Sequence, residues 1–178
     1  MMKHLVGVLL LWSLGSGCVP LPFEGGKVEC AGDTCTCKPE PRCTGECMEP
    51  GCSLACADGP DCDVRCGVGC KHRCTGATNC TTTCEKDCDL ECGRVTSCES
   101  RCGANCHQRC SDASNCAFTV GAASEVSCQR VGNCNVTCEG ACRVDCRETG
   151  NCNVTCKETG GSATLCPNGT TRVCGQSC

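Results

Sequence analysis

Cysteine recurs along this chain at a fixed spacing, and that spacing constrains the fold more than any other feature. From Cys62 the cysteines fall in fours with the pattern C-x3-C-x3-C-x3-C-x5, and the next unit starts 18 residues later at Cys80. Further units of the same pattern start at Cys98 and Cys134. A fixed period near 20 residues indicates a solenoid or an array of stacked repeats.

The residues between the cysteines favour β-strands over a helix. The five-residue spacers, such as 75–79 and 147–151, are rich in Gly, Thr, Ser and Asn, which tend to end helices. In the three-residue segments that open and close a unit, the middle residue is often apolar with polar neighbours, as at Val136; His72 and Gln108 are exceptions. This period-two alternation predicts strands that place the cysteines and the middle residue on one face.

Each unit is therefore expected to form a strand, a short turn, a second strand and a longer turn. Stacked units of this kind give a small disulfide-rich all-β fold, either a flattened β-solenoid or an antiparallel hairpin array. The architecture resembles that of the small disulfide-filled solenoids of insect antifreeze proteins, without sharing a specific motif with them. The repeats cover residues 43–156 and lie between a cysteine-rich cap at 30–42 and another at 157–178.

The composition indicates that disulfides stabilise this fold. The chain has 31 cysteines, no Tyr and only two Phe, so it buries too few large apolar side chains to offset the entropy of folding. Closing a loop of about five residues with a disulfide contributes roughly 2 kcal/mol on the chain-entropy model. When Cys18 is set aside, the remaining cysteines are even in number and can all pair.

Two irregular units predict which cysteines pair. The unit that starts at Cys43 has one extra residue between its second and third cysteines, within a Pro-Gly turn. The unit that starts at Cys116 lacks both its second and its third cysteine. The loss of two cysteines together is what the loss of one disulfide between them would produce. We therefore expect the second and third cysteines of each unit to pair: Cys66 with Cys70, Cys84 with Cys88, Cys102 with Cys106, and Cys138 with Cys142.

The outer cysteines of a unit allow two pairing schemes. They can pair within a unit, as Cys62 with Cys74, or across the five-residue spacer, as Cys74 with Cys80. The second scheme is favoured because it pairs neighbours in order and leaves no cysteine over. It runs along the chain from Cys30–Cys35 and Cys37–Cys43 to Cys174–Cys178.

The first residues of the chain predict export. A short polar start precedes the apolar run 5–12, which is too short to cross a bilayer as a helix. Small residues at 15–17 then precede Cys18. This segment resembles the signal peptide and lipobox of bacterial lipoproteins, although Gly15 stands where that family usually has Leu.

The resemblance implies that residues 1–17 are a signal peptide and that Cys18 carries a lipid anchor to a membrane. Residues 18–29 would then form a tether. Val19 after the cysteine implies sorting to the outer membrane of a bacterial cell envelope. An ordinary signal peptide and secretion are the alternative.

The function expected from these features is that of an exported structural or macromolecule-binding surface module, with an envelope protein or a glycan as partner. The alternative is metallothionein-like sequestration of zinc or copper by cysteine thiolates. Nucleic acid is disfavoured as a partner because acidic residues outnumber basic ones.

Catalysis is not expected. His72 and His107 lie outside the signal peptide, but no nucleophile motif, phosphate loop or nucleotide fingerprint accompanies them. The sequence therefore gives no catalytic, cofactor-binding or metal-binding residue, and no cofactor.

Overall fold

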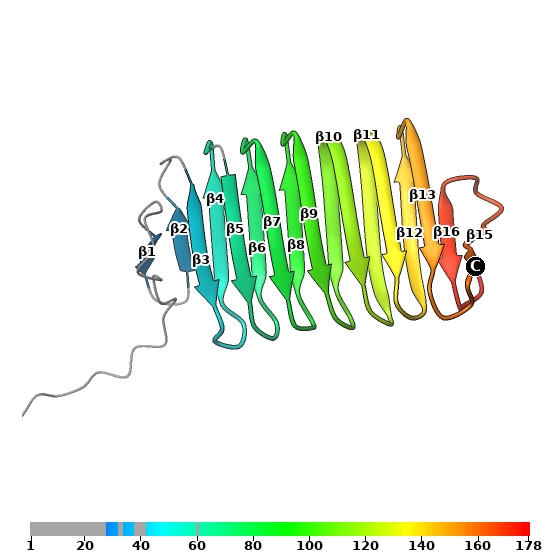
Figure 1. Ribbon diagram of the computed structural model, residues 1–178, viewed down its shortest axis with the longest axis horizontal. Coiled ribbons are helices and arrows are strands. Elements are labelled where there is room, and N and C mark those ends of the chain that lie inside the picture. The colour runs from blue at the N-terminus through cyan, green and yellow to red at the C-terminus, as the bar shows by residue number, and fades with distance from the viewer. Residues whose placement is uncertain (1–27, 32–33, 38–41, 60) are drawn as a thin grey trace, which may run out of the picture.

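The structure is a computed structural model that describes residues 28–31, 34–37, 42–59 and 61–178. Within these ranges the regular elements are all β-strands, and they wind into a β-solenoid of about six turns (Figure 1). The predicted class, a small disulfide-rich all-β fold, is confirmed. None of the described residues form a helix long and apolar enough to cross a bilayer.

The solenoid has two flat sides, each made of stacked parallel strands. One side contains β2 (Thr34–Cys37), β4 (Ser53–Ala57), β6 (Lys71–Thr75), β8 (Asp89–Gly93), the first halves of β10 (His107–Val120) and β11 (Ser124–Cys138), and β12 (Cys142–Arg147). The other side contains β3 (Cys43–Cys47), β5 (Asp61–Cys66), β7 (Asn79–Cys84), β9 (Ser97–Cys102), the second halves of β10 and β11, and β13 (Asn151–Cys156).

The register of these strands follows the cysteine period. Cys62 lies beside Cys80 and Cys80 beside Cys98, so that each residue stacks on the one 18 positions later. The pairing is parallel, which decides for the solenoid over the antiparallel hairpin array. Each strand therefore pairs with the equivalent strand of the next coil, and equivalent positions of successive repeats lie side by side.

The core lies between the two sides and consists of cysteines and the middle residues of the strands. Burial alternates along each strand, as in β5 and β7, because successive side chains point to opposite faces. Leu54, Leu90, Val126 and Val144 are buried on one side, and Val64, Phe118 and Val136 on the other. The predicted alternation therefore places the cysteines and the middle residues of the strands in the core, as the structure shows.

The turns at the two edges share one backbone conformation from coil to coil. In the five-residue spacers the second residue has a positive φ, from Asp58 (52°) and Gly76 (71°) to Glu148 (52°). Close packing of coils also requires particular glycines: a Cβ on Gly103 would collide with the carbonyl oxygen of Glu85 in the preceding coil. A side chain at that position would push the coils apart.

The disulfides decide between the two pairing schemes for the outer cysteines. The structure joins them across the spacer, in the pairs Cys56–Cys62, Cys74–Cys80, Cys92–Cys98, Cys110–Cys116, Cys128–Cys134 and Cys146–Cys152. It joins second and third cysteines in the pairs Cys47–Cys52, Cys66–Cys70, Cys102–Cys106 and Cys138–Cys142. Both edges of the solenoid are thus cross-linked.

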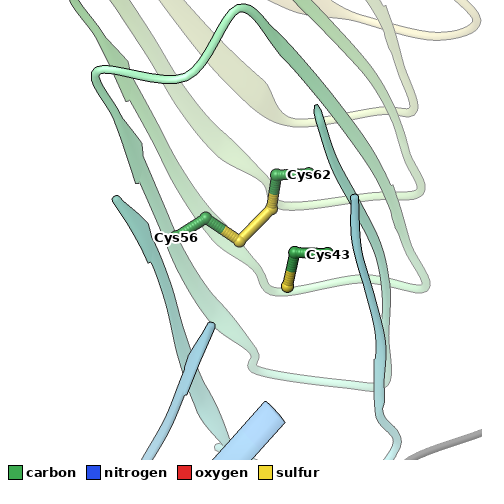
Figure 2. Close-up of side chains that lie close together, drawn as sticks. All are labelled: Cys43, Cys56 and Cys62. Atoms are coloured by element: carbon green, nitrogen blue, oxygen red, sulfur yellow. A yellow bond between two sulfur atoms is a disulfide. The ribbon is translucent and has the colours of Figure 1, made fainter. Parts of the chain in front are cut away.

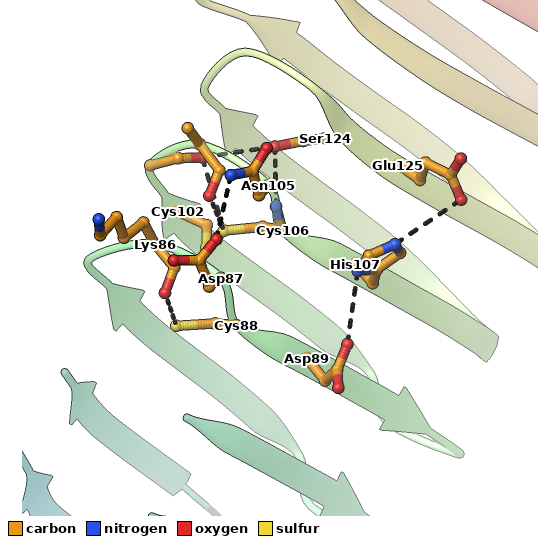
Figure 3. A network of polar contacts seen from close by, with 12 residues as sticks. Lys86, Asp87, Cys88, Asp89, Cys102, Asn105, Cys106, His107, Ser124 and Glu125 are labelled. Atoms are coloured by element: carbon orange, nitrogen blue, oxygen red, sulfur yellow. Dashed lines mark hydrogen bonds and ion pairs between the residues drawn. A yellow bond between two sulfur atoms is a disulfide. The ribbon is translucent and has the colours of Figure 1, made fainter. Parts of the chain in front are cut away.

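One predicted pair is not joined. Cys84 and Cys88 are free and buried, in contrast to the expected disulfide. The Cys88 sulfur lies 3.2 Å from the carbonyl oxygens of Gly67 and Lys86, which accept from its thiol; Figure 3 shows the contact with Lys86. The Cys88 thiol also makes a hydrogen bond with Cys84, so the two sulfurs are neighbours that are not joined.

The sequential scheme is also wrong at the C-terminus. Cys174 pairs with Cys156, and Cys178 pairs with Cys166. After β13 the chain turns back through β14 (Gly161–Ser162), β15 (Thr164–Leu165) and β16 (Thr171–Cys174), and β16 runs antiparallel to β12. This reversal brings Cys174 to the last coil, so that the cap disulfides connect segments distant in sequence.

Several predictions fall on residues that the structure does not describe. Cys18, the signal peptide and most of the tether lie outside the described residues, and so do the side chains of Cys30, Cys35 and Cys37. β1 (Val28–Ala31) pairs antiparallel with β2. Cys43 is disulfide-bonded, and its predicted bond to Cys37 stays a prediction.

Candidate functional site

The side of the solenoid that contains β6, β8 and β12 presents two rows of outward-facing side chains, which together we call the charged face. The first row is Lys71, Asp89, His107, Glu125 and Arg143, and the second is Arg73, Glu91, Arg109, Ser127 and Asp145. Neighbours within a row occupy equivalent positions in successive coils, so their side chains lie side by side. Basic and acidic groups alternate through the first row.

Alternation lets the charges of the first coils neutralise one another. Arg73 Nη2 lies 2.7 Å from Glu91 Oε2, and the two side chains form an ion pair. The imidazole of His107 lies between two carboxylates, with Nδ1 3.6 Å from Asp89 and Nε2 3.9 Å from Glu125 (Figure 3). Protonated His107 can therefore pair with both carboxylates.

The charged face is hollowed in two places. One hollow, of about 620 Å³, extends over β4, β6 and β8 to His107 and Arg109. The other, of about 330 Å³, begins at the same two residues and reaches β12 and the C-terminal cap. Such volumes suit a small ligand or one unit of a larger one. The two hollows adjoin at His107 and Arg109, which line both.

The opposite face has a different chemistry toward the C-terminal end. On β10, β11 and β13 its outward positions are Ala117, Asn135 and Asn153 in one row and Thr119, Thr137 and Thr155 in the next. Asn153 donates a hydrogen bond to Asn135 at 3.0 Å. These side chains carry no charge, so these two rows offer a partner hydrogen bonds but no ionic contacts.

Beneath the charged face, His72 is part of the core. It is 2% exposed, and its Nδ1 lies 2.7 Å from the hydroxyl of Thr82 on the facing strand. Burial lowers the pKa of His72 to about 4, because the interior disfavours the charged ring. His72 is therefore neutral at physiological pH and has a structural position.

The free thiols form a second cluster, at the edge of the solenoid. The sulfur atoms of Cys84, Cys88 and Cys102 all lie within 4.8 Å of one another. A hydrogen bond with Cys84 holds the pKa of the Cys88 thiol at about 7, whereas the same contact together with burial raises the pKa of Cys84. Cys102 is bonded to Cys106, so only two of the three sulfurs are thiols.

The other sulfur clusters of the described residues are not sets of thiols. Cys43, Cys56 and Cys62 lie together in the core, and Figure 2 shows the bond that joins Cys56 to Cys62. Cys43 is also disulfide-bonded. A sulfur in a disulfide is not the thiolate that zinc and copper require, so this proximity reflects core packing.

The sequence pointed to the core and to most of the cross-links of the repeats, except Cys84–Cys88 and the cap pairs, but not to the charged face. His107 was considered only as one of two histidines, and the structure places it at the centre of that face, while His72 lies inside. A signal was present, because the charges that flank the middle residues change sign every 18 residues in the first row. Sign alternation at the repeat period is what paired charges on neighbouring strands of successive units would produce.

Comparison with known proteins finds no matching family model, no matching curated protein and no matching solved structure.

Proposed function

We propose that this protein is an exported cell-envelope module, lipid-anchored through Cys18, whose rigid solenoid presents the charged face to another macromolecule. It acts by binding or spacing rather than by catalysis. The observation that carries this proposal is the cross-linking of both edges of the solenoid by disulfides. They fix the shape of a chain whose core has few large apolar side chains.

The disulfides support the exported part of the proposal. Twelve disulfides lie within the described residues. Bonds in this number form and persist in oxidising compartments and are rare in reducing ones.

The charged face supports the binding part. Because its side chains project from parallel strands in fixed register, little backbone entropy is lost when a partner binds. Repeat arrays commonly use extended surfaces of this kind. The two hollows add a place where a partner can insert a group between the rows.

Metal sequestration is the weaker alternative. Most of the described cysteines are oxidised, and the two free ones, Cys84 and Cys88, offer only two of the four ligands that a structural zinc site requires. The described residues therefore favour a disulfide scaffold over a thiolate store.

The test is an intact mass of the exported protein, purified without reductant, before and after alkylation, with metal analysis of the same sample. We expect alkylation of at most the two thiols Cys84 and Cys88, no stoichiometric zinc or copper, and the mass of a lipid on Cys18. Alkylation of many thiols together with stoichiometric metal would contradict the proposal.

The lipid anchor is tested separately with Cys18→Ala. The variant should lose the lipid mass and no longer sediment with membranes, while its disulfide map stays that of the parent. If the parent protein carries no lipid and is recovered in the soluble fraction, the anchor is wrong and ordinary secretion takes its place.

A further inference from the structure

The thiols of Cys84 and Cys88 lie at the edge of the solenoid where three-residue turns connect the strands. The equivalent cysteines of the neighbouring coils are joined, as Cys66–Cys70 before this pair and Cys102–Cys106 after it. Among the described cysteines this pair is the exception, since the others are in disulfides. A dithiol within a stack of disulfides can react with a bond beside it.

The sulfur contacts of the dithiol favour the bond of the following coil. The Cys102 sulfur lies within 4.8 Å of the sulfurs of both Cys84 and Cys88. The cluster includes neither sulfur of the preceding pair, and toward that coil the Cys88 thiol donates to the carbonyl oxygen of Gly67. The dithiol therefore contacts the Cys102 end of a disulfide.

Hydrogen bonds between the two turns hold the sulfurs in this position. The N–H of Gly103 donates to the Glu85 carbonyl oxygen at 2.9 Å, and the N–H of Asp87 donates to the Ala104 carbonyl oxygen at 3.0 Å. The Asn105 side chain donates to Asp87 at 3.0 Å, and Figure 3 shows this contact beside Cys88 and Cys106. Reacting groups held together in a rigid frame have a high effective concentration.

Burial limits which disulfide the thiols can attack. Cys84 is 7% exposed and Cys88 is 1% exposed, so the disulfides of other proteins do not reach them. The hydrogen bond with Cys84 holds the pKa of the Cys88 thiol at about 7. A thiol whose pKa is near the ambient pH is the most effective attacking group, so Cys88 is the nucleophile of an intramolecular reaction.

We propose that the dithiol exchanges with the neighbouring disulfide, so that the open cross-link moves between two coils. The Cys88 thiolate attacks the Cys102 sulfur, the Cys88–Cys102 bond forms, and Cys106 leaves as a thiolate that takes up the proton lost by Cys88. Cys84 then attacks Cys88, which forms the Cys84–Cys88 bond and releases Cys102 as a thiolate that takes up the proton lost by Cys84. One disulfide breaks for each that forms, so no oxidant or reductant is needed.

The next coil stops the exchange on the C-terminal side. It has Val120 and Ser124 in place of the two cysteines, and both are buried. The next cysteines on this edge are Cys138 and Cys142, two coils beyond Cys102 and Cys106. Because their disulfide has no thiol beside it on this edge, it provides a control within the same chain.

The test maps the thiols of the full chain, purified without reductant. After incubation at pH 8 the sample is acidified to stop exchange, unfolded in guanidinium with excess N-ethylmaleimide, and digested for mass spectrometry. We expect two labels per chain among the described cysteines, shared between the pair Cys84/Cys88 and the pair Cys102/Cys106. In Cys84→Ser the second step is impossible, so a single label should be shared between Cys88 and Cys106 while Cys102 stays unlabelled.

The matched control is the double variant Cys84→Ser/Cys88→Ser, in which Cys102 and Cys106 should carry no label. Labels confined to Cys84 and Cys88 after any time of incubation, or no label at all, would overturn the exchange. Labels on Cys138 and Cys142 as well would overturn it too, because they would indicate general scrambling of the disulfides. The number of thiols stays two in the exchange, so the alkylation count that tests the exported scaffold does not depend on it.

Discussion

The burial of His72 predicts a specific loss of stability in acid. In the folded chain the pKa of this histidine is lowered from 6.5 to about 4 by desolvation, whereas in the unfolded chain it regains its ordinary value. Between these two values the unfolded state binds the proton and the folded state does not. The free energy of unfolding therefore falls as the pH falls from about 6.5 to about 4.

The size of this effect follows from the difference between the two pKa values. At 1.36 kcal/mol for each pH unit, the shift from 6.5 to about 4 corresponds to about 3 kcal/mol. The contribution is fully present above pH 6.5 and fully lost below pH 4. Because His72 is only 2% exposed, solvent screening reduces this value little.

The register of the coils provides a matched variant. His72 stacks between Leu54 and Leu90, and its hydrogen-bond partner Thr82 stacks on Val64. The double variant His72→Leu/Thr82→Val therefore matches the apolar residues of the neighbouring coils. Ser100, the other neighbour of Thr82, keeps its hydrogen bond to Gln108, so no buried hydroxyl is left unpaired. It should fold as the parent does.

The assay is guanidinium unfolding with the disulfides intact, followed by circular dichroism at pH 7 and at pH 4. Carboxylates also titrate in this range, so the informative quantity is the difference between the parent and the double variant. We expect the parent to lose about 3 kcal/mol more than the variant on acidification.

An equal loss of stability in the parent and the double variant would refute the reasoning. It would mean either that His72 is protonated in the folded chain or that unfolding with intact disulfides leaves it buried. A proton NMR titration of the His72 ring separates these two cases, because it reports the pKa of the folded state directly.

Two other predictions concern the edges of the coils. Gly103→Ala should destabilise the solenoid by about 1–3 kcal/mol in the same assay, because its methyl group would collide with the Glu85 carbonyl oxygen. The control is Gly59→Ala, whose Cβ would have its nearest contact at 4.0 Å and which should change stability by less than about 0.5 kcal/mol. Equal effects of the two substitutions would contradict the tight packing at Gly103. Without reductant, iodoacetamide should label Cys84 and Cys88 only after the chain is unfolded, because both thiols are buried. Mild oxidation should close a disulfide between Cys84 and Cys88 and so abolish the labelling of the parent chain, whereas Cys84→Ser should still be labelled at Cys88. Labelling of the oxidised parent chain would show that the two sulfurs cannot form this bond.

The sequence predicted much of the fold because its period is visible in the spacing of a single residue type. The paired loss of cysteines at Val120 and Ser124 pointed to bonds between second and third cysteines, and in the structure both replacements are buried. The Ser124 hydroxyl accepts a hydrogen bond from the backbone N–H of Cys106 at 3.1 Å. The turn therefore keeps its shape although the disulfide is absent.

The candidate site was far less accessible to sequence reasoning. Arg109 and Arg143 are nearly two repeats apart, and each alternates with buried residues like most outward positions of the chain. Whether they line the same hollow depends on how successive coils stack and on where the C-terminal cap lies. Asn168 joins the same hollow only because the cap folds back onto β12.

By itself the sequence determined the 18-residue register, the alternation of buried and exposed positions, and the dependence on disulfides, because each follows from local spacing and composition. The tertiary structure set the parallel sense of the strands, since a strand–turn–strand unit has the same local pattern in a solenoid and in a hairpin array. It also decided the cap disulfides Cys156–Cys174 and Cys166–Cys178, because cysteines pair by distance in space, and the reversal of the chain after β13 sets those distances.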